Sequence, residues 1–324
     1  MKWIASLIAT LAVTASLAET QSTSAVGAYS ESMLPASARA EAGARKLTVM
    51  FIGVTTLLFD DGETAIMTDG YFTRAPRESL NSIQPDKDRI ARSLQRAGVK
   101  SLAAVIPLHS HFDHALDSPV VALQTGALLV GSESTANIAR GYSFPEKRIR
   151  TVSNGETVSF GRFNVTFVIS AHLPNNFAMG EITAPLSVPA KATDFKVGDA
   201  YSVFIEHDGR TILVQGSAGF VPGGLSGRSA DVVYLGIGGL GLRDTPYKDS
   251  YWQELVRSVG ARRVVPIHWD NFFKPVDEVL IPDTGFDKAM EFLLNRGKED
   301  GIDIRLPPAW TWTEPLSGIR QRKQ

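Results

Sequence analysis

The sequence contains no cysteine, and it has only six histidines in 324 residues. Without thiols the chain can form no disulfide, carry no lipid on an N-terminal cysteine and bind no metal through a thiolate. Its formal net charge of -1 gives no electrostatic reason to expect nucleic acid as a partner. Hydrophobic residues make up 44% of the chain and its mean hydropathy is -0.02, values that indicate an ordinary globular protein with a sizeable core.

Long apolar runs are also scarce, and the longest one lies at the N-terminus. Lys2 is followed by the mainly apolar run 3–15, and small residues stand at Ser16 and Ala18. This pattern is typical of a secretory signal, and the run is too short for comfortable membrane spanning. We expect a signal peptide over residues 1–18, cleavage after Ala18, and a periplasmic or secreted protein without a stable membrane anchor. A retained anchor is the alternative.

The rest of the chain predicts one domain without an internal linker. Residues 19–45 are rich in Ser, Ala, Thr and Glu and lack clear periodicity, which indicates a leader that is partly disordered or loosely helical. Strand-like runs begin at Lys46 and recur toward the C-terminus, so we predict a catalytic domain at 46–315 and a tail at 316–324. Within the domain, helical spacing over 86–97 predicts a helix, and Asp208-Gly209 predicts a tight hairpin.

Three of the few histidines fall in one six-residue string. It reads His109-Ser110-His111-Phe112-Asp113-His114 and directly follows an apolar run. Two further histidines, His172 and His268, each close a strand-like run. Imidazole nitrogen and carboxylate oxygen together suit zinc, with manganese or iron as competitors. Because so few histidines are this tightly grouped, the string predicts a metal site.

The string also matches the HxHxDH signature of the metallo-β-lactamase superfamily, which the chain resembles from about Lys46 to about Asn271. His172 and His268 stand where that family has its next and last ligands. The resemblance implies an α/β (α+β) fold, the four-layer αββα sandwich in which two sheets pack face to face with helices outside. It also implies that the ligands divide between two metals, with His109, His111 and His172 on the first and Asp113, His114 and His268 on the second.

One position departs from the family pattern. Most of its hydrolases carry an aspartate that bridges the two metals after a hydrophobic strand, and here Ser217 follows the strand-like run 211–214. A neutral hydroxyl is a weak zinc ligand beside a carboxylate, although one subclass of true β-lactamases resembles this arrangement and still binds two zincs. We therefore expect one or two zinc ions per chain, the second held more weakly.

The resemblance implies a zinc-dependent hydrolase, and the predicted signal peptide adds that it is secreted. Three protein ligands per zinc leave an open position for water, and zinc lowers the pKa of that water from 15.7 to about 7. The resulting hydroxide could attack an ester, lactone, amide or phosphodiester. Asp113 is the expected catalytic residue, because its carboxylate could steer the hydroxide and carry a proton to the leaving group.

Other polar and apolar residues rank as secondary candidates. Asp69, at the end of a strand-like run, could accept a hydrogen bond from a ligand histidine, although a simple turn aspartate is the alternative. Arg74 could contact a substrate anion or be solvated, as most charged residues are. His207 is predicted to be an ordinary surface residue. The segment 173–196, which contains Phe177, could be a loop that contacts an apolar part of the substrate, or an insert packed on the core.

Several functions stay open at this point. The pattern resembles a branch that includes lipid phosphodiesterases similar to N-acylphosphatidylethanolamine phospholipase D, whose DHLD-like string is comparable to residues 113–117 here. We therefore expect a small-molecule or lipid-like substrate. The alternatives are a β-lactamase-type amide hydrolase, a lactonase, and a non-catalytic metal-binding recognition protein, which the loss of the bridging acid favours. Diiron oxygen- or NO-reducing members are disfavoured, because they typically have glutamate where His111 stands.

Overall fold

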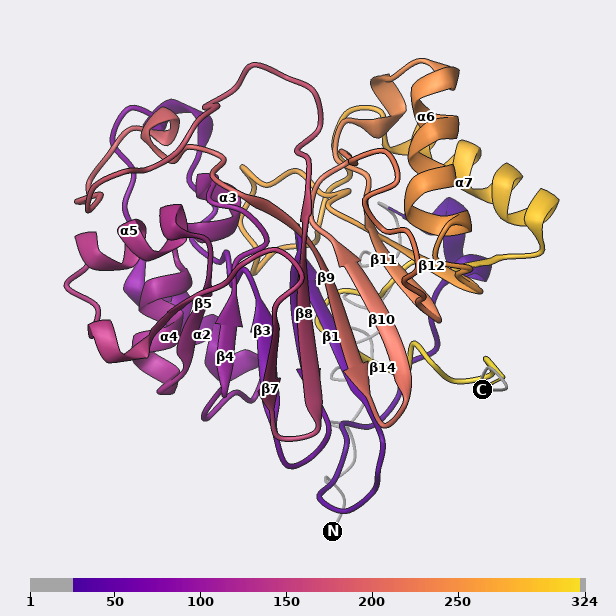
Figure 1. Cartoon of the computed structure of the whole chain (residues 1–324), viewed down its shortest axis with the longest axis horizontal. Helices are drawn as coiled ribbons and strands as arrows, with labels where there is room; N and C mark the ends of the chain where they lie inside the picture. Colours follow the sequence, from indigo (N-terminus) through magenta and orange to yellow (C-terminus); the bar gives the residue numbers. More distant parts are fainter. Residues whose placement is uncertain (1–25, 321–324) are drawn as a thin grey trace, which may run out of the picture.

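Two seven-stranded sheets lie face to face between two groups of helices in the computed structural model, which describes residues 26–320 (Figure 1). This arrangement confirms the expected four-layer αββα sandwich. The predicted signal peptide at 1–18 lies outside the described residues, as do positions 19–25 and 321–324. Within 26–320, none of the helices combines the length and the apolar character needed to cross a bilayer.

The first sheet combines an antiparallel and a parallel half. In spatial order its strands are β14 (Trp312–Thr313), β1 (Thr48–Gly53), β2 (Thr56–Asp60), β3 (Ala65–Thr68), β4 (Ala104–Ile106), β5 (Leu128–Gly131) and β6 (Ile149–Thr151). Neighbours from β14 to β3 pair antiparallel, whereas those from β3 to β6 pair parallel. Parallel neighbours need crossover connections, and helices supply them.

The crossover helices of this half cover the outer face of the first sheet (Figure 1). They are α2 (Lys87–Arg96), α4 (Ser118–Thr125) and α5 (Glu133–Gly141), whereas the short helix α3 (Phe112–Ala115) lies at the edge where the strands end. Helix α2 matches the helix predicted at 86–97, and the Asp86 carboxylate caps its start by accepting a hydrogen bond from the Arg89 amide at 2.9 Å. The apolar side chains of α2 and α4 pack against the first sheet and form a second hydrophobic core there.

The second sheet has the same two-part plan. In spatial order it contains β13 (Asp303–Ile304), β12 (Arg263–Ile267), β11 (Val232–Gly236), β10 (Arg210–Gln215), β9 (Ala200–His207), β8 (Phe163–Ser170) and β7 (Thr157–Phe160). The helices α6 (Thr245–Trp252) and α7 (Phe286–Asp300) lie on its outer side (Figure 1). The predicted hairpin joins β9 to β10, with positive φ angles of 49° at Asp208 and 73° at Gly209, as a tight two-residue turn requires.

The main hydrophobic core lies between the two sheets. Phe59 of the first sheet meets Tyr234 of the second edge to face, with ring centroids 6.2 Å apart. Both side chains are fully buried and belong to one cluster that extends to α6 and α7. Burying this apolar surface holds the sheets together and fixes the ends of their strands relative to one another.

The described part of the predicted leader, residues 26–45, packs on the domain, and the prediction for 19–45 as a whole stays a prediction. A 3₁₀ helix occupies Gly27–Ser32, Leu34 is buried in the main core, and Met33 forms a β-bridge with Leu306. Such a segment has no helical or alternating pattern in its sequence, because it is attached to the domain by single side chains and isolated β-bridges. The predicted tail contributes to the same core, through Leu316 and Ile319.

Candidate metal centre

All the predicted ligands come to one edge of the sandwich, where strands end. His109 lies just past the end of β4, His172 past β8 and His268 past β12. His111 directly precedes the short helix α3, which carries Asp113 and His114. Because the two sheets pack face to face, loops from both halves of the chain meet at this edge, and ligands far apart in sequence become neighbours.

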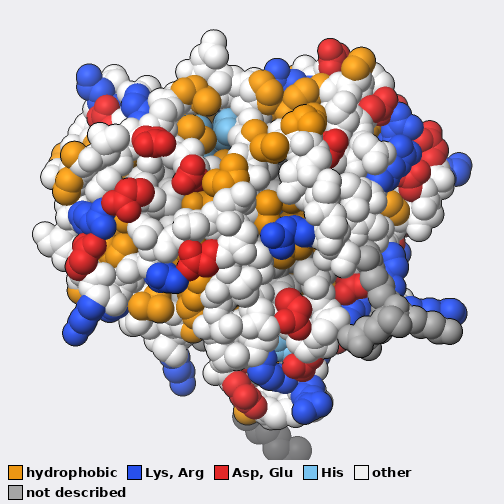
Figure 2. Space-filling view, in the orientation of Figure 1, with side chains coloured by type: hydrophobic (Ala, Val, Ile, Leu, Met, Phe, Trp, Pro, Cys, Tyr) orange, Lys and Arg blue, Asp and Glu red, His pale blue; other side chains and the backbone are white. Residues whose placement is uncertain are grey.

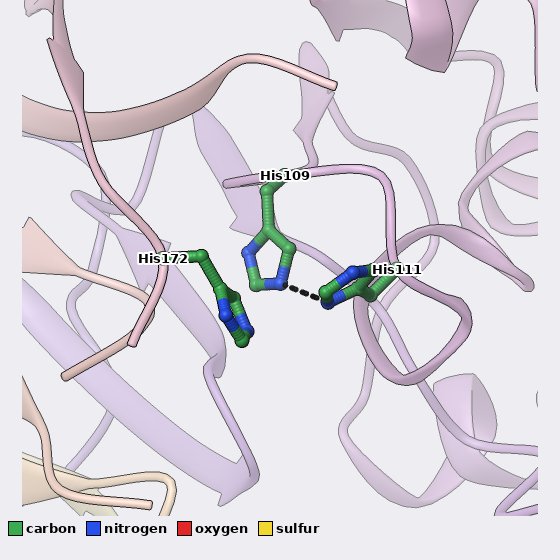
Figure 3. A group of neighbouring side chains, drawn as sticks. All are labelled: His109, His111 and His172. Carbon is green, nitrogen blue, oxygen red and sulfur yellow. Dashed lines mark hydrogen bonds between the residues drawn. The ribbon is translucent and has the colours of Figure 1, made fainter. Parts of the chain in front are cut away.

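The first group of ligands is formed by His109, His111 and His172, whose rings face one another (Figure 3). One nitrogen from each lies within 4.8 Å of the others. His109 Nε2 is 3.2 Å from His111 Nδ1, and the ring centroid of His172 lies 5.0 Å from that of His109 and 4.6 Å from that of His111. These are the three residues that the family resemblance implied for the first metal.

The second group joins Asp113, His114 and His268, with ligand atoms again within 4.8 Å of one another. Asp113 Oδ2 is 3.5 Å from His114 Nε2 and 3.4 Å from His268 Nε2. The two groups adjoin, because the rings of His109 and His114 have centroids only 3.8 Å apart. The structure thus brings all six predicted ligands into one centre and divides them as expected.

The side chains present fit metal ions. His111 Nε2 and His114 Nε2 are buried and have no hydrogen-bond partner among residues 26–320. Buried polar atoms without a partner are rare in folded proteins, and coordination to a cation would satisfy both. Five imidazoles and one carboxylate form a donor set suited to zinc. His109, His111 and His172 would hold one ion, and Asp113, His114 and His268 the other.

Burial sets the protonation of the first group. It lowers the pKa of His109 well below 6.5, and the neighbouring histidines His114 and His111 lower it further. Burial likewise lowers the pKa of His172 to about 4. Since neutral imidazole is the form that binds metal, these ligands are ready to coordinate at neutral pH and well below it.

Carboxylates set the protonation of the second group. Burial alone would lower the pKa of His114, but Asp69 and Asp113 outweigh it and raise the pKa. Burial would raise the pKa of Asp113, but His114 and His268 outweigh it and hold the pKa well below its usual range. Asp113 is therefore ionised at neutral pH and can act as a ligand or a proton acceptor.

Asp69 lies where the sequence placed an acceptor for a ligand histidine. Its Oδ2 atom is 2.7 Å from His114 Nδ1, and its Oδ1 atom accepts a hydrogen bond from the Leu108 amide at 2.8 Å. The Thr55 hydroxyl also bonds to this carboxylate. Asp69 has a positive φ of 54°, an uncommon backbone conformation for a residue other than glycine. The carboxylate orients the imidazole so that Nε2 of His114 faces Asp113.

We expect Asp69→Asn to weaken metal binding by the second group by about 10–100-fold, the usual loss when the partner of a ligand histidine is removed. Competition with a chromophoric chelator would measure the change. Asp60→Asn is the matched control, because Asp60 is as buried but pairs with Arg39, away from the ligands. Unchanged affinity in Asp69→Asn would show that His114 does not depend on this carboxylate.

Arg74 is neither solvated nor available to a substrate, so both predictions for it were wrong. Its side chain is fully buried, and Nη1 forms an ion pair with Asp270 Oδ2 at 2.7 Å. Asp270 also accepts a hydrogen bond from the Val54 amide at 2.7 Å. The Val54 carbonyl in turn accepts from the His268 amide at 2.6 Å. The buried pair therefore connects the turn between β1 and β2 to the last metal ligand.

His207 is not a surface residue, which corrects a second prediction. It is the last residue of β9 and is buried, with Nε2 3.1 Å from Asp61 Oδ2. Arg162 Nε pairs with the same carboxylate at 3.0 Å. The neighbouring turn at Asp208-Gly209 led to the wrong prediction, because the turn is exposed while the strand end before it faces inward.

Ser217 lies beside the loop that carries a ligand of the first group. Its hydroxyl oxygen accepts a hydrogen bond from the Leu173 amide at 2.9 Å, and Leu173 directly follows His172. The side chain is largely buried. The serine is therefore bonded to the residue that follows His172, and its role at the bridging position stays a prediction.

We expect Ser217→Asp to tighten the more weakly held metal ion, because a carboxylate is a better metal ligand than a neutral hydroxyl. A chelator titration that resolves two binding steps would measure the change. Ser217→Asn is the control, since it has nearly the same size as aspartate and no charge. If neither variant changes the weaker step, position 217 has been wrongly assigned to the bridge.

The segment 173–196 is anchored to the core at a few positions, and most of its other residues are exposed. The backbone holds its first part near the ligands, because the Ala178 carbonyl accepts from the Val197 amide at 2.9 Å and the Val197 carbonyl accepts from Ser110 at 3.0 Å. Phe177 remains 37% exposed, and its ring centroid is 5.5 Å from that of His111. Three of the later apolar side chains are buried: Ile182, Ala192 and Phe195.

Sequence reasoning missed three residues at this centre. The Thr55 hydroxyl lies 2.9 Å from His114 Nδ1. Phe272 and Phe273 lie on the loop after His268, and the Phe272 ring centroid is 5.7 Å from that of the histidine. The two phenylalanines could have been found from their position, because they follow the ligand His268 by four and five residues. Nothing in the sequence marked Thr55.

Comparison with known proteins agrees with the geometry. The model of the β-lactamase superfamily domain matches residues 66–269, more than half of the chain. Proteins named UPF0173 metal-dependent hydrolases are 23% identical, over 232 residues in Exiguobacterium sp. and 234 residues in Staphylococcus aureus. Each alignment covers 70% of this chain and 87% of the relative.

Solved structures share the fold at low sequence identity. A protein of Parabacteroides distasonis assigned to the metal-dependent hydrolases aligns with a TM-score of 0.51 and 14% identity, over 85% of this chain and 99% of its own. CmlA, a diiron β-hydroxylase from Streptomyces venezuelae, aligns with a TM-score of 0.52 and 12% identity, over 81% of this chain and 52% of its own. Fold and ligands together define a metal-binding αββα sandwich. The chain belongs to the metallo-β-lactamase superfamily.

Proposed function

We propose that this protein, a metal-dependent hydrolase of the metallo-β-lactamase superfamily, holds two zinc ions and cleaves an ester, lactone, amide or phosphodiester bond in a small-molecule or lipid-like substrate. The observation that carries the proposal is the pair of adjoining ligand groups, each with three protein ligands. Three ligands leave a zinc coordination position open, as in catalytic sites and unlike closed structural sites. The unpartnered ring nitrogens of His111 and His114 support the same assignment.

When bound, the metals supply a water of pKa about 7 and polarise the oxygen of the bond to be cleaved. The chain itself supplies Asp113, whose carboxylate lies between His114 and His268. Because those histidines hold its pKa well below the usual range, Asp113 is ionised when the substrate arrives. It can accept a hydrogen bond from the attacking water, orient it, and pass its proton to the leaving group.

The balance of charge favours an anionic substrate oxygen. Among the six ligands Asp113 is the single carboxylate, so a centre with two divalent ions keeps a strong positive charge. Asp69 supplies a further negative charge, but it lies behind His114 and does not belong to either ligand group. A phosphodiester, or a carboxylate next to the scissile bond, would therefore be drawn to the centre.

We also propose that the protein is exported. The support is the N-terminal pattern of Lys2, the apolar run 3–15 and the small residues Ser16 and Ala18. The mature chain is expected to begin at Glu19. Intact-mass measurement on the extracytoplasmic fraction tests this, and a mass that still includes Met1 would contradict it.

The hydrolase proposal is tested by elemental analysis and a substrate screen on the same preparations. We expect two ions per chain, loss of turnover after chelation, and recovery with zinc. The screen should include esters, lactones and phosphodiesters, and also β-lactams, because Ser217 favours a β-lactamase-type amide hydrolase as second candidate. Manganese or iron in the purified protein would change the metal assignment. Full metal loading without turnover of any substrate class would favour a non-catalytic recognition protein.

A further inference from the structure

Four phenylalanines form a continuous surface beside the metal centre, which we call the phenylalanine wall. Its members are Phe112, Phe177, Phe272 and Phe273. Phe112 occupies the middle, with ring centroids 6.3 Å from Phe177, 6.1 Å from Phe272 and 6.4 Å from Phe273. The helix α3 supplies Phe112 and two separate loops supply the other three rings, so the wall forms only when the chain has folded.

The wall reaches both groups of metal ligands. At one end the Phe177 ring lies 5.5 Å from the His111 ring, which belongs to the first group. At the other end the Phe272 ring lies 5.7 Å from the His268 ring, which belongs to the second group. A substrate whose reacting oxygen sits between the two groups would therefore have aromatic surface along one side.

The outer part of the wall is open to solvent. Phe112 is buried and forms its base, whereas Phe177 is 37% exposed and the rings at 272 and 273 are only partly buried. Figure 2 shows apolar side chains gathered around a visible histidine near the upper edge of the molecule. Aromatic surface left in contact with water beside a cationic centre is available to cover an apolar group of a ligand.

The part of the wall formed by Phe272 and Phe273 is held in place by contacts within the protein. The Asn271 side chain accepts a hydrogen bond from the Phe273 amide at 3.1 Å, and the Asn271 amide donates to the Ile281 carbonyl at 2.7 Å. The guanidinium of Arg77 lies over the Phe273 ring, 4.1 Å from its centroid. A preformed surface loses little conformational entropy when a ligand covers it.

We propose that the substrate carries an aromatic ring next to the bond that is cleaved, and that the phenylalanine wall binds this ring while the metals bind the reacting oxygen. The inference rests on the proposed function and names its substrate class. Aromatic pairs gain from edge-to-face and offset geometry in addition to the burial of apolar area, and all four wall residues offer rings. An aryl group is therefore favoured over both a small alkyl group and a saturated ring.

Binding of non-hydrolysable anions to the zinc-loaded protein tests the inference without requiring turnover. Isothermal titration would compare phenylphosphonate with methylphosphonate and cyclohexylphosphonate. We expect phenylphosphonate to bind about tenfold or more tighter than the methyl compound, because the ring buries more apolar area. It should also bind about two- to tenfold tighter than the cyclohexyl compound. Failure of either preference would overturn the assignment of an aromatic substrate.

Variants separate ligand binding from a structural role of the rings. Phe272→Ala and Phe177→Ala should reduce the preference for phenyl over methyl by about threefold or more each, and leave methylphosphonate affinity nearly unchanged. Phe220→Ala is the matched control, because this half-buried ring packs on Tyr247, with centroids 5.5 Å apart, and not on a ligand histidine. A wall that only supports the ligands would lower the affinities for both phosphonates equally, which would overturn the inference.

The two proposals fail in different ways. If the aryl preference is found but no ester, amide or phosphodiester is turned over, the hydrolase proposal fails and the wall is retained as a binding surface. If turnover is found and the phosphonates bind without preference, the hydrolase proposal holds and the wall inference is wrong.

Discussion

Replacing Asp113 by asparagine is expected to lower kcat by about 10²–10⁴-fold, the range associated with loss of a positioned acid–base group. Asparagine keeps the size of the side chain but removes the charge that His114 and His268 stabilise. It also weakens one ligand of the second group, so part of the loss should remain even at saturating zinc. Steady-state kinetics on protein with a verified metal content would measure the effect.

His207→Ala provides the comparison for this experiment. His207 is buried and paired with Asp61, so its removal should lower the free energy of unfolding. Because it lies at the hairpin end of β9 and no ligand contacts it, kcat per folded molecule should be close to that of the parent. Equal losses of kcat in the two variants would show that the six-ligand centre is not the catalytic site.

Arg74→Met is expected to lower the free energy of unfolding by about 3–5 kcal/mol, because it leaves the buried carboxylate of Asp270 without its counter-ion. Urea denaturation followed by circular dichroism would measure the loss. Since Asp270 also binds the Val54 amide, and Val54 binds His268, affinity for the second metal should fall as well.

The control for Arg74→Met is Arg39→Met. Arg39 pairs with Asp60 at 2.6 Å, and its side chain is 40% exposed whereas that of Arg74 is fully buried, so water screens the charge of Arg39 more. We expect this variant to lose less stability than Arg74→Met. If both variants lose the same small amount, the Arg74–Asp270 pair does not behave as a buried ion pair.

The six ligands and the fold could be predicted because their signals are local. His109, His111, Asp113 and His114 lie in one string, and His172 and His268 each follow a run of apolar residues that reads as a strand. Strand ends and short sequence motifs can be recognised without knowledge of the tertiary structure. The superfamily resemblance then supplied the order of the layers, which apolar periodicity alone does not determine.

The errors concern residues whose environment depends on distant partners. Arg74 was expected to be exposed because isolated arginines usually are, and its partner Asp270 lies 196 positions away. His207 is likewise buried and paired with Asp61, which is 146 positions away. The wall was missed for the same reason, since Phe112 meets Phe272 only after both sheets have formed. Contacts of this range are set by packing and leave no spacing pattern in the sequence.

The distribution of ligands over the chain has a consequence for folding. The half of the chain that forms the first sheet supplies His109, His111, Asp113 and His114, and the half that forms the second sheet supplies His172 and His268. Neither half alone offers either ion its three ligands. Each bound ion would therefore act as a cross-link between the halves and stabilise the assembled sandwich by about 2.7 kcal/mol at a free metal concentration 100 times its Kd. Removal of the metal should accordingly weaken the packing between the two sheets before it affects the structure of either sheet.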